Sequence, residues 1–289
     1  MSGDYGVPDL ERYSHSFTAM ASPCAIHLYT DDVRRARAAA EAAEAEVRRI
    51  ESRYSRFRAD SLLSTINAIA WDGGEIVVDD ETAALLDFAF AAHAESDGLF
   101  DITAGLLLRA WNFTEPRLPT PAELAALLPR IGMNQLDWQR PLLRFLRPGM
   151  ALDFGGIGKG WALDRAAEVL RARGVSRAFV NFGGQIMALG TAEDGGDWTV
   201  VLPGRAEPLR VRDASVSTSG DSERPGHIVS PVDGRPVRRT VSATAVLPRA
   251  TDADAWSTAL YVLGKTPPSF PGRSYFAAAP SRPIKGKAP

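Results

Sequence analysis

The sequence contains a single cysteine, Cys24, in 289 residues, which excludes an internal disulfide. It also has no apolar run close to the roughly 20 residues of a membrane-spanning helix, so we expect no membrane span. Its first residues are polar and acidic and lack the apolar segment of a signal peptide, which predicts a cytoplasmic protein. A formal net charge of -2 gives no reason to expect nucleic acid as a partner.

Lysine is scarce as well: of 33 lysine and arginine residues only four are lysine, and three of those lie at or beyond residue 265. The fourth, Lys159, stands between two glycines in the segment 151–190, which predicts a strand, a glycine-rich loop and a helix over 161–173. Backbone N–H groups of such a loop can approach an anion closely, and a helix that begins there favours negative charge. A compact ammonium in this loop indicates a phosphate or carboxylate ligand, the alternative being a solvated loop lysine.

The loop matches neither of the two common phosphate-binding motifs. It lacks G-x-G-x-x-G, and Gly160 follows Lys159 where a Walker A motif has Ser or Thr. The motif alone therefore does not name the ligand.

The order of the expected elements indicates an α+β fold in a soluble globular protein, in which 45% of the residues are hydrophobic. Apolar spacing predicts helices at 31–54, from residue 60 or 61, at 80–96, near 122–128 and at 252–263, and strands at 25–29, 76–78, 198–202, 209–211, 215–217, 227–230 and 241–247. Helices and strands do not alternate strictly, which argues against a doubly wound parallel sheet.

We expect one domain over residues 17–264, preceded by a loose leader at 1–16 and followed by a Pro-rich tail at 265–289. The segment 116–121 is rich in proline and typical of a linker. The stretch between it and the glycine loop is too short to bury a core of its own, so we do not place a domain boundary there.

Asp254 and Thr258 lie four residues apart in a predicted helix, so their oxygens share one face. Oxygen ligands in this arrangement suit a hard cation such as Mg²⁺. An acidic first turn that favours the helix dipole explains Asp254 equally well. Together with the loop around Lys159, the pair indicates metal-assisted chemistry on a phosphoanhydride.

Four further positions carry polar or aromatic side chains of interest. His227 follows the hydroxyl-rich run STSGDSER on a predicted strand, and is either a general base or ligand contact or a hydrogen-bonded core histidine. Phe57 is either a core aromatic or a ring that stacks on a planar ligand. Asp101 and Thr103 are expected to cap the next helix.

Six motifs in this order resemble the ApbE family over about residues 17–264: SRFRADSLLSTIN, GLFDITAGLLLRAW, LDFGGIGKGWALD, VNFGGQI, STSGDSER with HIVSPVDGRP, and ADAWSTALYVLG. The resemblance implies an α+β domain with a flavin nucleotide site in a central cleft. It also implies Mg²⁺-dependent cleavage of FAD, with transfer of FMN to a threonine hydroxyl of an acceptor protein and release of AMP. Acceptors of this family carry a motif of the type D-x-x-[S/T]-G-A-T.

The resemblance also implies roles for individual residues. It makes His227, Asp254 and Lys159 catalytic, and gives the metal ligands as Asp254, Thr258 and the carbonyl of Gly158. The residues expected to bind the flavin nucleotide are Met20, Phe57, Asp153, Lys159, Asp164, Asn181, Gly183, Gly184, Ser219, Gly220 and His227.

The sequence departs from the family pattern at two side chains and at one end. Gln185 stands where the family usually has Asp, Phe57 where Tyr is frequent, and the chain turns Pro-rich after Gly264 where relatives continue with a helix and a closing strand. The alternatives that remain are an FAD pyrophosphatase giving FMN and AMP, and a non-catalytic FAD-binding protein. The sequence names neither the acceptor protein nor the oligomeric state.

Overall fold

The computed structural model describes residues 10–110, 119–221 and 226–278. Its main feature is a seven-stranded sheet in which every neighbouring pair is antiparallel. In the order of pairing, the strands are β1 (Glu11–Ala19), β2 (Ser22–Thr30), β6 (Ala178–Phe182), β7 (Gln185–Leu189), β10 (Ala214–Ser219), β11 (Val241–Leu247) and β12 (Arg273–Ala278).

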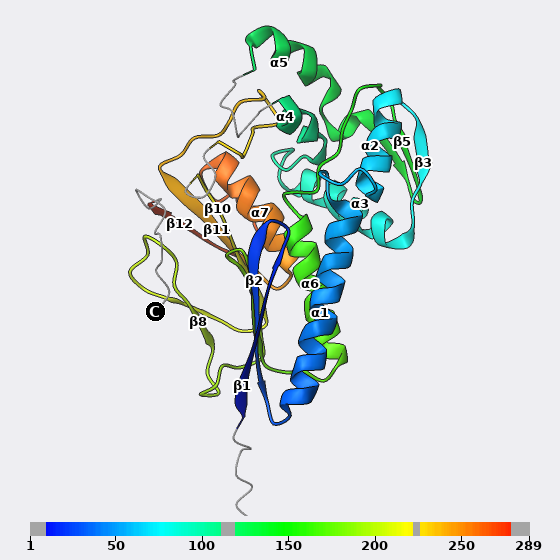
Figure 1. The fold of residues 1–289 in the computed structure, drawn as a ribbon. Coiled ribbons are helices and arrows are strands. Elements are labelled where there is room, and N and C mark those ends of the chain that lie inside the picture. Colours follow the sequence, from blue (N-terminus) through cyan, green and yellow to red (C-terminus); the bar gives the residue numbers. More distant parts are fainter. Residues whose placement is uncertain (1–9, 111–118, 222–225, 279–289) are drawn as a thin grey trace, which may run out of the picture.

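Helices cover one face of this sheet, and a lobe of shorter elements lies beyond one end of the helices (Figure 1). The helices are α1 (Val33–Tyr54), α2 (Leu62–Asp72), α3 (Asp80–Glu95), α4 (Gly105–Ala110), α5 (Pro121–Leu127), α6 (Gly158–Ala172) and α7 (Ala250–Leu263), with 3-10 turns at Ile102–Ala104, Leu128–Arg130 and Met133–Gln135. A three-stranded sheet in the lobe has the order β3 (Glu75–Val77), β5 (Leu142–Phe145), β4 (Leu136–Gln139), and β8 (Trp198–Val200) pairs with β9 (Leu209–Val211).

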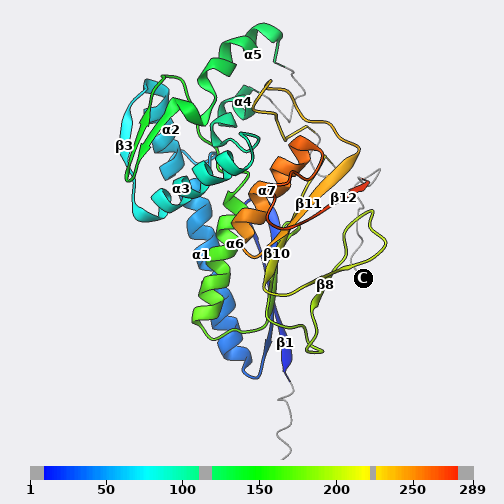
Figure 2. The same ribbon diagram turned by 180° about the vertical axis from the view of Figure 1, so that it is seen from behind.

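The α+β fold class is confirmed, and the alternation of side chains in the strands explains its layers. In β7, Met187 and Leu189 join the core beneath α1 and α6, whereas Ile186 and Ala188 pack against the β8–β9 pair on the opposite face. Figure 2, from behind, shows the strand β8 beside the sheet and α7 next to α6. The central strands β7 and β11 are therefore buried on both faces, which fixes their register.

α1 packs along α6 because its inward face is built from alanine. Ala36, Ala40 and Ala43 are buried there, and small side chains let two helices approach closely. The N-cap is Asp32, whose side chain accepts from the backbone N–H groups of Arg34 and Arg35, so the helix begins two residues later than the predicted 31.

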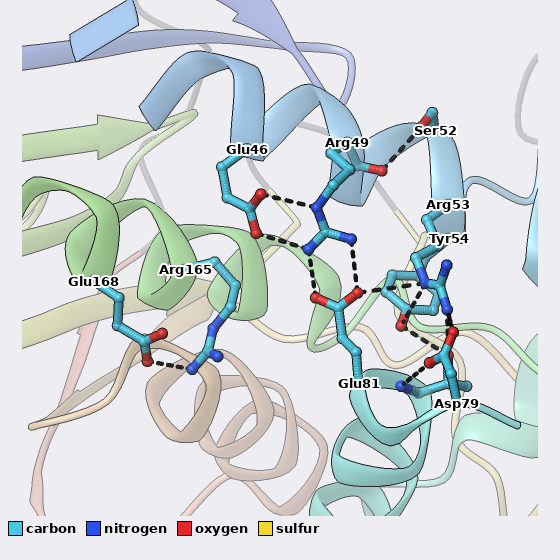
Figure 3. Close-up of polar contacts among 10 residues, drawn as sticks. Glu46, Arg49, Ser52, Arg53, Tyr54, Asp79, Glu81, Arg165 and Glu168 are labelled. Carbon is cyan, nitrogen blue, oxygen red and sulfur yellow. Dashed lines mark hydrogen bonds and ion pairs between the residues drawn. The ribbon is translucent and has the colours of Figure 1, made fainter. Parts of the chain in front are cut away.

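A charged network joins the C-terminal half of α1 to the start of α3 (Figure 3). Arg49 lies between Glu46 and Glu81, and its Nη2 atom is 2.7 Å from Glu46 Oε1 and 2.6 Å from Glu81 Oε1. Hydrogen bonds to these two carboxylates raise the pKa of the Arg49 guanidinium above its usual value. Arg53 pairs with Asp79, the N-cap of α3. The network holds the end of α1 against the lobe, although ion pairs that are this exposed contribute at most about 1 kcal/mol each.

Two predicted boundaries of the sheet were wrong. β1 begins at Glu11, inside the predicted leader, because Tyr13, His15 and Phe17 alternate toward the helices while the polar residues between them face out. β12 lies inside the predicted Pro-rich tail and pairs with β11 along its length, so it supplies a closing strand. Residues 1–9, 279–289 and the first half of the predicted linker 116–121 lie outside the described residues.

The predicted strand at 227–230 is not formed in the described structure. Val229 makes one isolated bridge to Pro236, and Gly234 precedes that proline with a φ of 70°. The N–H of Ser230 donates to the carbonyl of Arg235 and the N–H of Val237 to the carbonyl of Ile228, so pairing is confined to this one bridge. Among the described helices none is both long and apolar enough to span a membrane.

Candidate active site

The first turn of α6 meets the first turns of α7, and a glycine makes the contact possible. A Cβ on Gly160 would lie only 2.4 Å from the carbonyl oxygen of Ala250, so no larger residue fits without moving a helix. The N–H of Gly160 donates to Asp254 Oδ2 at 3.0 Å. The structure thus brings the glycine loop and the predicted metal ligand Asp254 together.

Asp254 is a buried carboxylate, with 6% of its surface exposed. Burial raises its pKa to about 6, and the nearby charge of Lys159 and the N–H of Gly160 only partly offset this effect. Ser217 on β10 also reaches the carboxylate, over a long 3.5 Å contact. A cation at this position would relieve the cost of keeping Asp254 charged at neutral pH.

Hydroxyl groups surround this carboxylate. Ser219 Oγ lies 2.9 Å from Ser257 Oγ and 3.3 Å from Thr258 Oγ1, which ties the end of β10 to α7. Thr258 in turn donates to the carbonyl of Asp254. The predicted residues Asp254, Thr258 and Ser219 therefore lie in one cluster.

The glycine loop runs beside these hydroxyls. A Cβ on Gly156 would come 4.0 Å from Thr258 Oγ1, whereas a Cβ on Gly158 would have no described atom within 4 Å. The described residues include no group of three His, Cys, Asp or Glu side chains that could hold a metal. The predicted metal set differs in kind, since it combines one carboxylate with a hydroxyl and a backbone carbonyl, oxygen donors that suit Mg²⁺.

Asp153 organises the entrance to this loop. Its Oδ1 accepts from the N–H of Gly155 and its Oδ2 from Arg56 Nη1, both at 2.5 Å. The Arg56 guanidinium also lies 4.7 Å from the ring centre of Phe57. Sequence reasoning did not select Arg56, although it lies inside the quoted SRFR motif.

Phe57 is 83% exposed, so the interpretation of this ring as a core aromatic was wrong. The reading that remains is a ring available to stack on a planar ligand. Since α1 ends at Tyr54, the charged network on that helix fixes the point from which Arg56 and Phe57 project.

The segment 151–154 was predicted to be a strand but pairs with a side chain instead. Asn67 of α2 donates from Nδ2 to the carbonyl of Leu152 and accepts from its N–H, at 3.0 Å and 2.7 Å. Its amide thereby replaces one residue of a neighbouring strand. The N–H of Asp153 donates to the carbonyl of Ile102, so the approach to the loop is held from two sides.

Asp164 has a structural role that the sequence did not predict. Its carboxylate accepts from the backbone N–H groups of Ala250 and Thr251 and from the Thr251 hydroxyl, at 2.6–2.9 Å. It caps α7 from the neighbouring helix, because the N-cap residue Arg249 makes no side-chain cap. Asp164 therefore positions the helix that carries Asp254, and its predicted contact with the nucleotide stays a prediction.

Gln185 supports the same turn of α7. Its Nε2 donates to the carbonyl of Ala250 at 2.8 Å, while its Oε1 is buried without a hydrogen-bond partner in the described part of the chain. An ionised aspartate at position 185 could not donate to a carbonyl. The hydrogen bond to Ala250 therefore depends on the glutamine that replaces the usual aspartate of the family.

The turn between β6 and β7 contains three predicted nucleotide residues. Asn181 Oδ1 accepts from the N–H of Gly184 at 2.8 Å, and Gly183 and Gly184 have φ values of 57° and 91°. A Cβ on Gly183 would approach Ser22 to 2.6 Å, so this turn lies against the β1–β2 turn that contains Met20. The structure therefore brings together two turns that were both predicted to contribute nucleotide-binding residues.

Gly220 and His227 both follow β10 along the chain. His227 is half-buried and lies just beyond residues 222–225, which are not described. Gly220 packs near Ser242, whose Cβ would be 3.1 Å from an added Cβ. The predicted roles of His227, Gly220 and Lys159 toward a ligand stay predictions. Asp101 caps the turn at Ile102–Ala104 as expected. Thr103 does not act as a cap, since it lies inside that turn, where its hydroxyl donates to Asp101 and accepts from the N–H of Gly132.

An α+β fold with a glycine loop at a helix start, a lysine in that loop and a buried carboxylate among hydroxyls is typical of proteins that handle phosphate-bearing nucleotides. Comparison with protein families makes this class more specific. The model of the ApbE family matches residues 20–268, and the chain belongs to the ApbE family.

Curated relatives carry one activity in their names. The FAD:protein FMN transferase of Treponema pallidum is 31% identical over 296 aligned residues, which cover 90% of this chain and 81% of the relative. The FAD:protein FMN transferase of Salmonella typhimurium is 30% identical, covering 73% of this chain and 67% of that protein.

Solved structures agree on the fold. The flavin transferase ApbE of Vibrio cholerae superimposes with a TM-score of 0.78 at 26% identity and covers 88% of this chain and 87% of its own. The flavinyl transferase ApbE of Pseudomonas stutzeri, in its apo form, superimposes with a TM-score of 0.83 at 25% identity. The match covers 93% of this chain and 91% of that structure's chain.

Proposed function

We propose that this protein transfers FMN from FAD to a threonine hydroxyl of an acceptor protein and releases AMP. The observation that carries the proposal is the contact between Gly160 N–H and the buried Asp254, which joins the glycine loop to an oxygen-rich cluster. The names of the relatives supply the reaction, and the acceptor motif D-x-x-[S/T]-G-A-T comes from the family resemblance.

In the proposed reaction the hydroxyl oxygen of the acceptor bonds to the phosphorus of the FMN half. The bond from that phosphorus to the bridging oxygen breaks, and AMP leaves with the oxygen. His227 takes up the hydroxyl proton, and Lys159 balances negative charge on the pyrophosphate. Asp254, Thr258 and the Gly158 carbonyl would hold Mg²⁺, which when bound neutralises charge at the phosphates.

The test is to incubate the purified protein with FAD, with and without Mg²⁺ and with and without a polypeptide that carries the acceptor motif. AMP release and the acceptor mass are measured. A mass gain of one FMN that requires Mg²⁺ is expected. AMP and free FMN without labelling would instead indicate a pyrophosphatase, and bound but intact FAD would indicate a non-catalytic binding protein.

Phe57→Ala is expected to weaken FAD binding about five- to tenfold without lowering the melting temperature, because the ring is exposed and available for stacking. Phe57→Tyr should keep the affinity. Trp71→Ala is the matched control, since Trp71 is also exposed but lies at the end of α2. Quenching of FAD fluorescence measures the affinity, and an equal loss in both alanine variants would contradict the stacking role.

A further inference from the structure

The β1–β2 turn has an unfavourable backbone. Ala19 pairs directly with Ser22, which leaves a two-residue turn of Met20 and Ala21 with φ values of 51° and 54°. Positive φ at both positions defines a type I′ turn, for which Asn-Gly is the preferred sequence. Residues with a side chain beyond Asn or Asp cost roughly 1–2 kcal/mol each in this region. Something outside the turn must therefore hold it.

The nearest such contact comes from α1. Glu51 Oε1 accepts from the N–H of Met20 at 2.5 Å, across 31 residues of sequence. A hydrogen bond to a carboxylate is stronger than one between neutral groups. Just beyond the turn, the N–H of Gly183 donates to the carbonyl of Pro23 at 2.9 Å. The turn is thus fixed from α1 on one side and from the β6–β7 turn on the other.

Hydrogen bonds connect this turn to the start of α7, which meets the glycine loop. Burial raises the pKa of the Cys24 thiol, the charge of Glu51 raises it further, and the charges of Arg48 and Lys159 lower it. Cys24 lies two residues after Ser22, the last partner of the turn. The β6–β7 turn, which donates to Pro23, leads directly into Gln185, whose Nε2 donates to the carbonyl of Ala250. These contacts connect the Met20 turn to the start of α7, where Gly160 of the glycine loop meets Ala250 and Asp254.

We propose that Glu51 is a positioning residue for FAD: its carboxylate holds the Met20–Ala21 turn in the left-handed conformation and thereby fixes the Met20 side chain at the edge of the nucleotide site. This inference rests on the proposed function, because the contact between Met20 and the flavin nucleotide is an expectation from the family resemblance. Glu51 itself does not touch FAD. Its effect passes through the backbone N–H of Met20.

A set of four variants tests the proposal. Glu51→Ala removes the acceptor, whereas Glu51→Gln keeps an oxygen that can accept from Met20. Ala21→Gly removes the steric cost of positive φ at the second turn position. The double variant Glu51→Ala/Ala21→Gly asks whether a turn that favours this conformation makes the carboxylate dispensable.

We expect Glu51→Ala to raise the Kd for FAD and the KM about tenfold with kcat changed less than twofold. Glu51→Gln should stay within about twofold of the wild type, and the double variant should recover most of the affinity. Glu41→Ala, at an exposed position on the same helix, controls for loss of a surface charge. Asp97 also has a positive φ, so Asp97→Gly relieves the same kind of backbone strain away from the turn. This change should not restore FAD affinity to Glu51→Ala, which would show that rescue by Ala21→Gly is not a general gain in stability.

Unchanged FAD affinity in Glu51→Ala, or no recovery in a folded double variant, would overturn the positioning role. Affinity is measured by fluorescence without turnover, so absent FMN transfer in the wild type would refute the proposed function while the affinity series still tests Glu51. If the wild type bound no FAD, the proposed function would fail. The role of Glu51 toward FAD would fail with it, whatever melting temperatures the variants showed.

Discussion

Asp254→Asn is expected to lower Mg²⁺-dependent AMP release by roughly 10²- to 10³-fold or more and, at neutral pH, to raise the melting temperature of the metal-free protein. The loss follows from the proposed metal contact. The gain in stability follows from burial, which raises the pKa of Asp254 from its usual 3.8 to about 6. Asparagine has nearly the same shape and keeps an oxygen for the N–H of Gly160.

The sign of the pH dependence follows from that pKa. The folded protein binds the Asp254 proton more tightly than the unfolded chain does, so the wild type loses stability as pH rises from about 4 to 6. With each pKa unit worth about 1.4 kcal/mol, the loss is on the order of 3 kcal/mol above pH 6. The difference between Asp254→Asn and the wild type should therefore be near zero at about pH 4 and largest above about pH 6.

Thermal melting in EDTA from about pH 4 to about pH 8 measures this difference, and adding Mg²⁺ should stabilise only the wild type. Asp252→Asn provides the control, since it makes the same change in the first turn of the same helix. It should retain Mg²⁺-dependent AMP release. Wild-type activity in Asp254→Asn would refute the metal assignment.

Gly160→Ala is expected to abolish most AMP release and to destabilise the protein, while Gly158→Ala two residues away is tolerated. The methyl group added at position 160 would meet the carbonyl oxygen of Ala250 at 2.4 Å and the Cα of Thr251 at 2.7 Å, both of them backbone atoms that cannot rotate away. Overpacking of this kind costs about 1–3 kcal/mol. Separation of α6 from α7 would also break the hydrogen bond between Gly160 and Asp254.

At Gly158 the same methyl has open space among the described residues, and alanine is the better helix former by up to about 1 kcal/mol. Thermal unfolding and AMP release of the two variants give the comparison. Equal behaviour of Gly158→Ala and Gly160→Ala would show that the close approach of the two helices does not matter for the site.

The pattern of apolar residues along the sequence predicted those helices and strands that depend mainly on their own residues. The strands at 209–211 and 241–247 have the predicted bounds, since apolar β-branched residues and flanking turns are sufficient there. α6 begins three residues earlier than predicted, at Gly158, because contacts with α7 offset the poor helix propensity of glycine. β12 was missed because its pairing with β11 is tertiary and its surroundings are rich in proline.

In the candidate site, too, some residues could be predicted from the sequence and others could not. Asp254, Thr258 and the loop were predictable because residue type and spacing carry their chemistry. The roles of Asn67 and Asp164 were not, because each acts on backbone groups more than 80 residues away. No local pattern in the sequence indicates such a partner.

The order of strands in the large sheet constrains the biosynthesis of the protein. The β1–β2 hairpin leaves the ribosome early, but its sheet partner β6 begins only at Ala178 and α7 only at Ala250. Until then one edge of β2 stays unpaired and depends on chaperones or on α1 for protection from aggregation. FAD cannot assist this early stage, because the loop at Gly158–Gly160 and Asp254 meet only when nearly the whole domain has been translated.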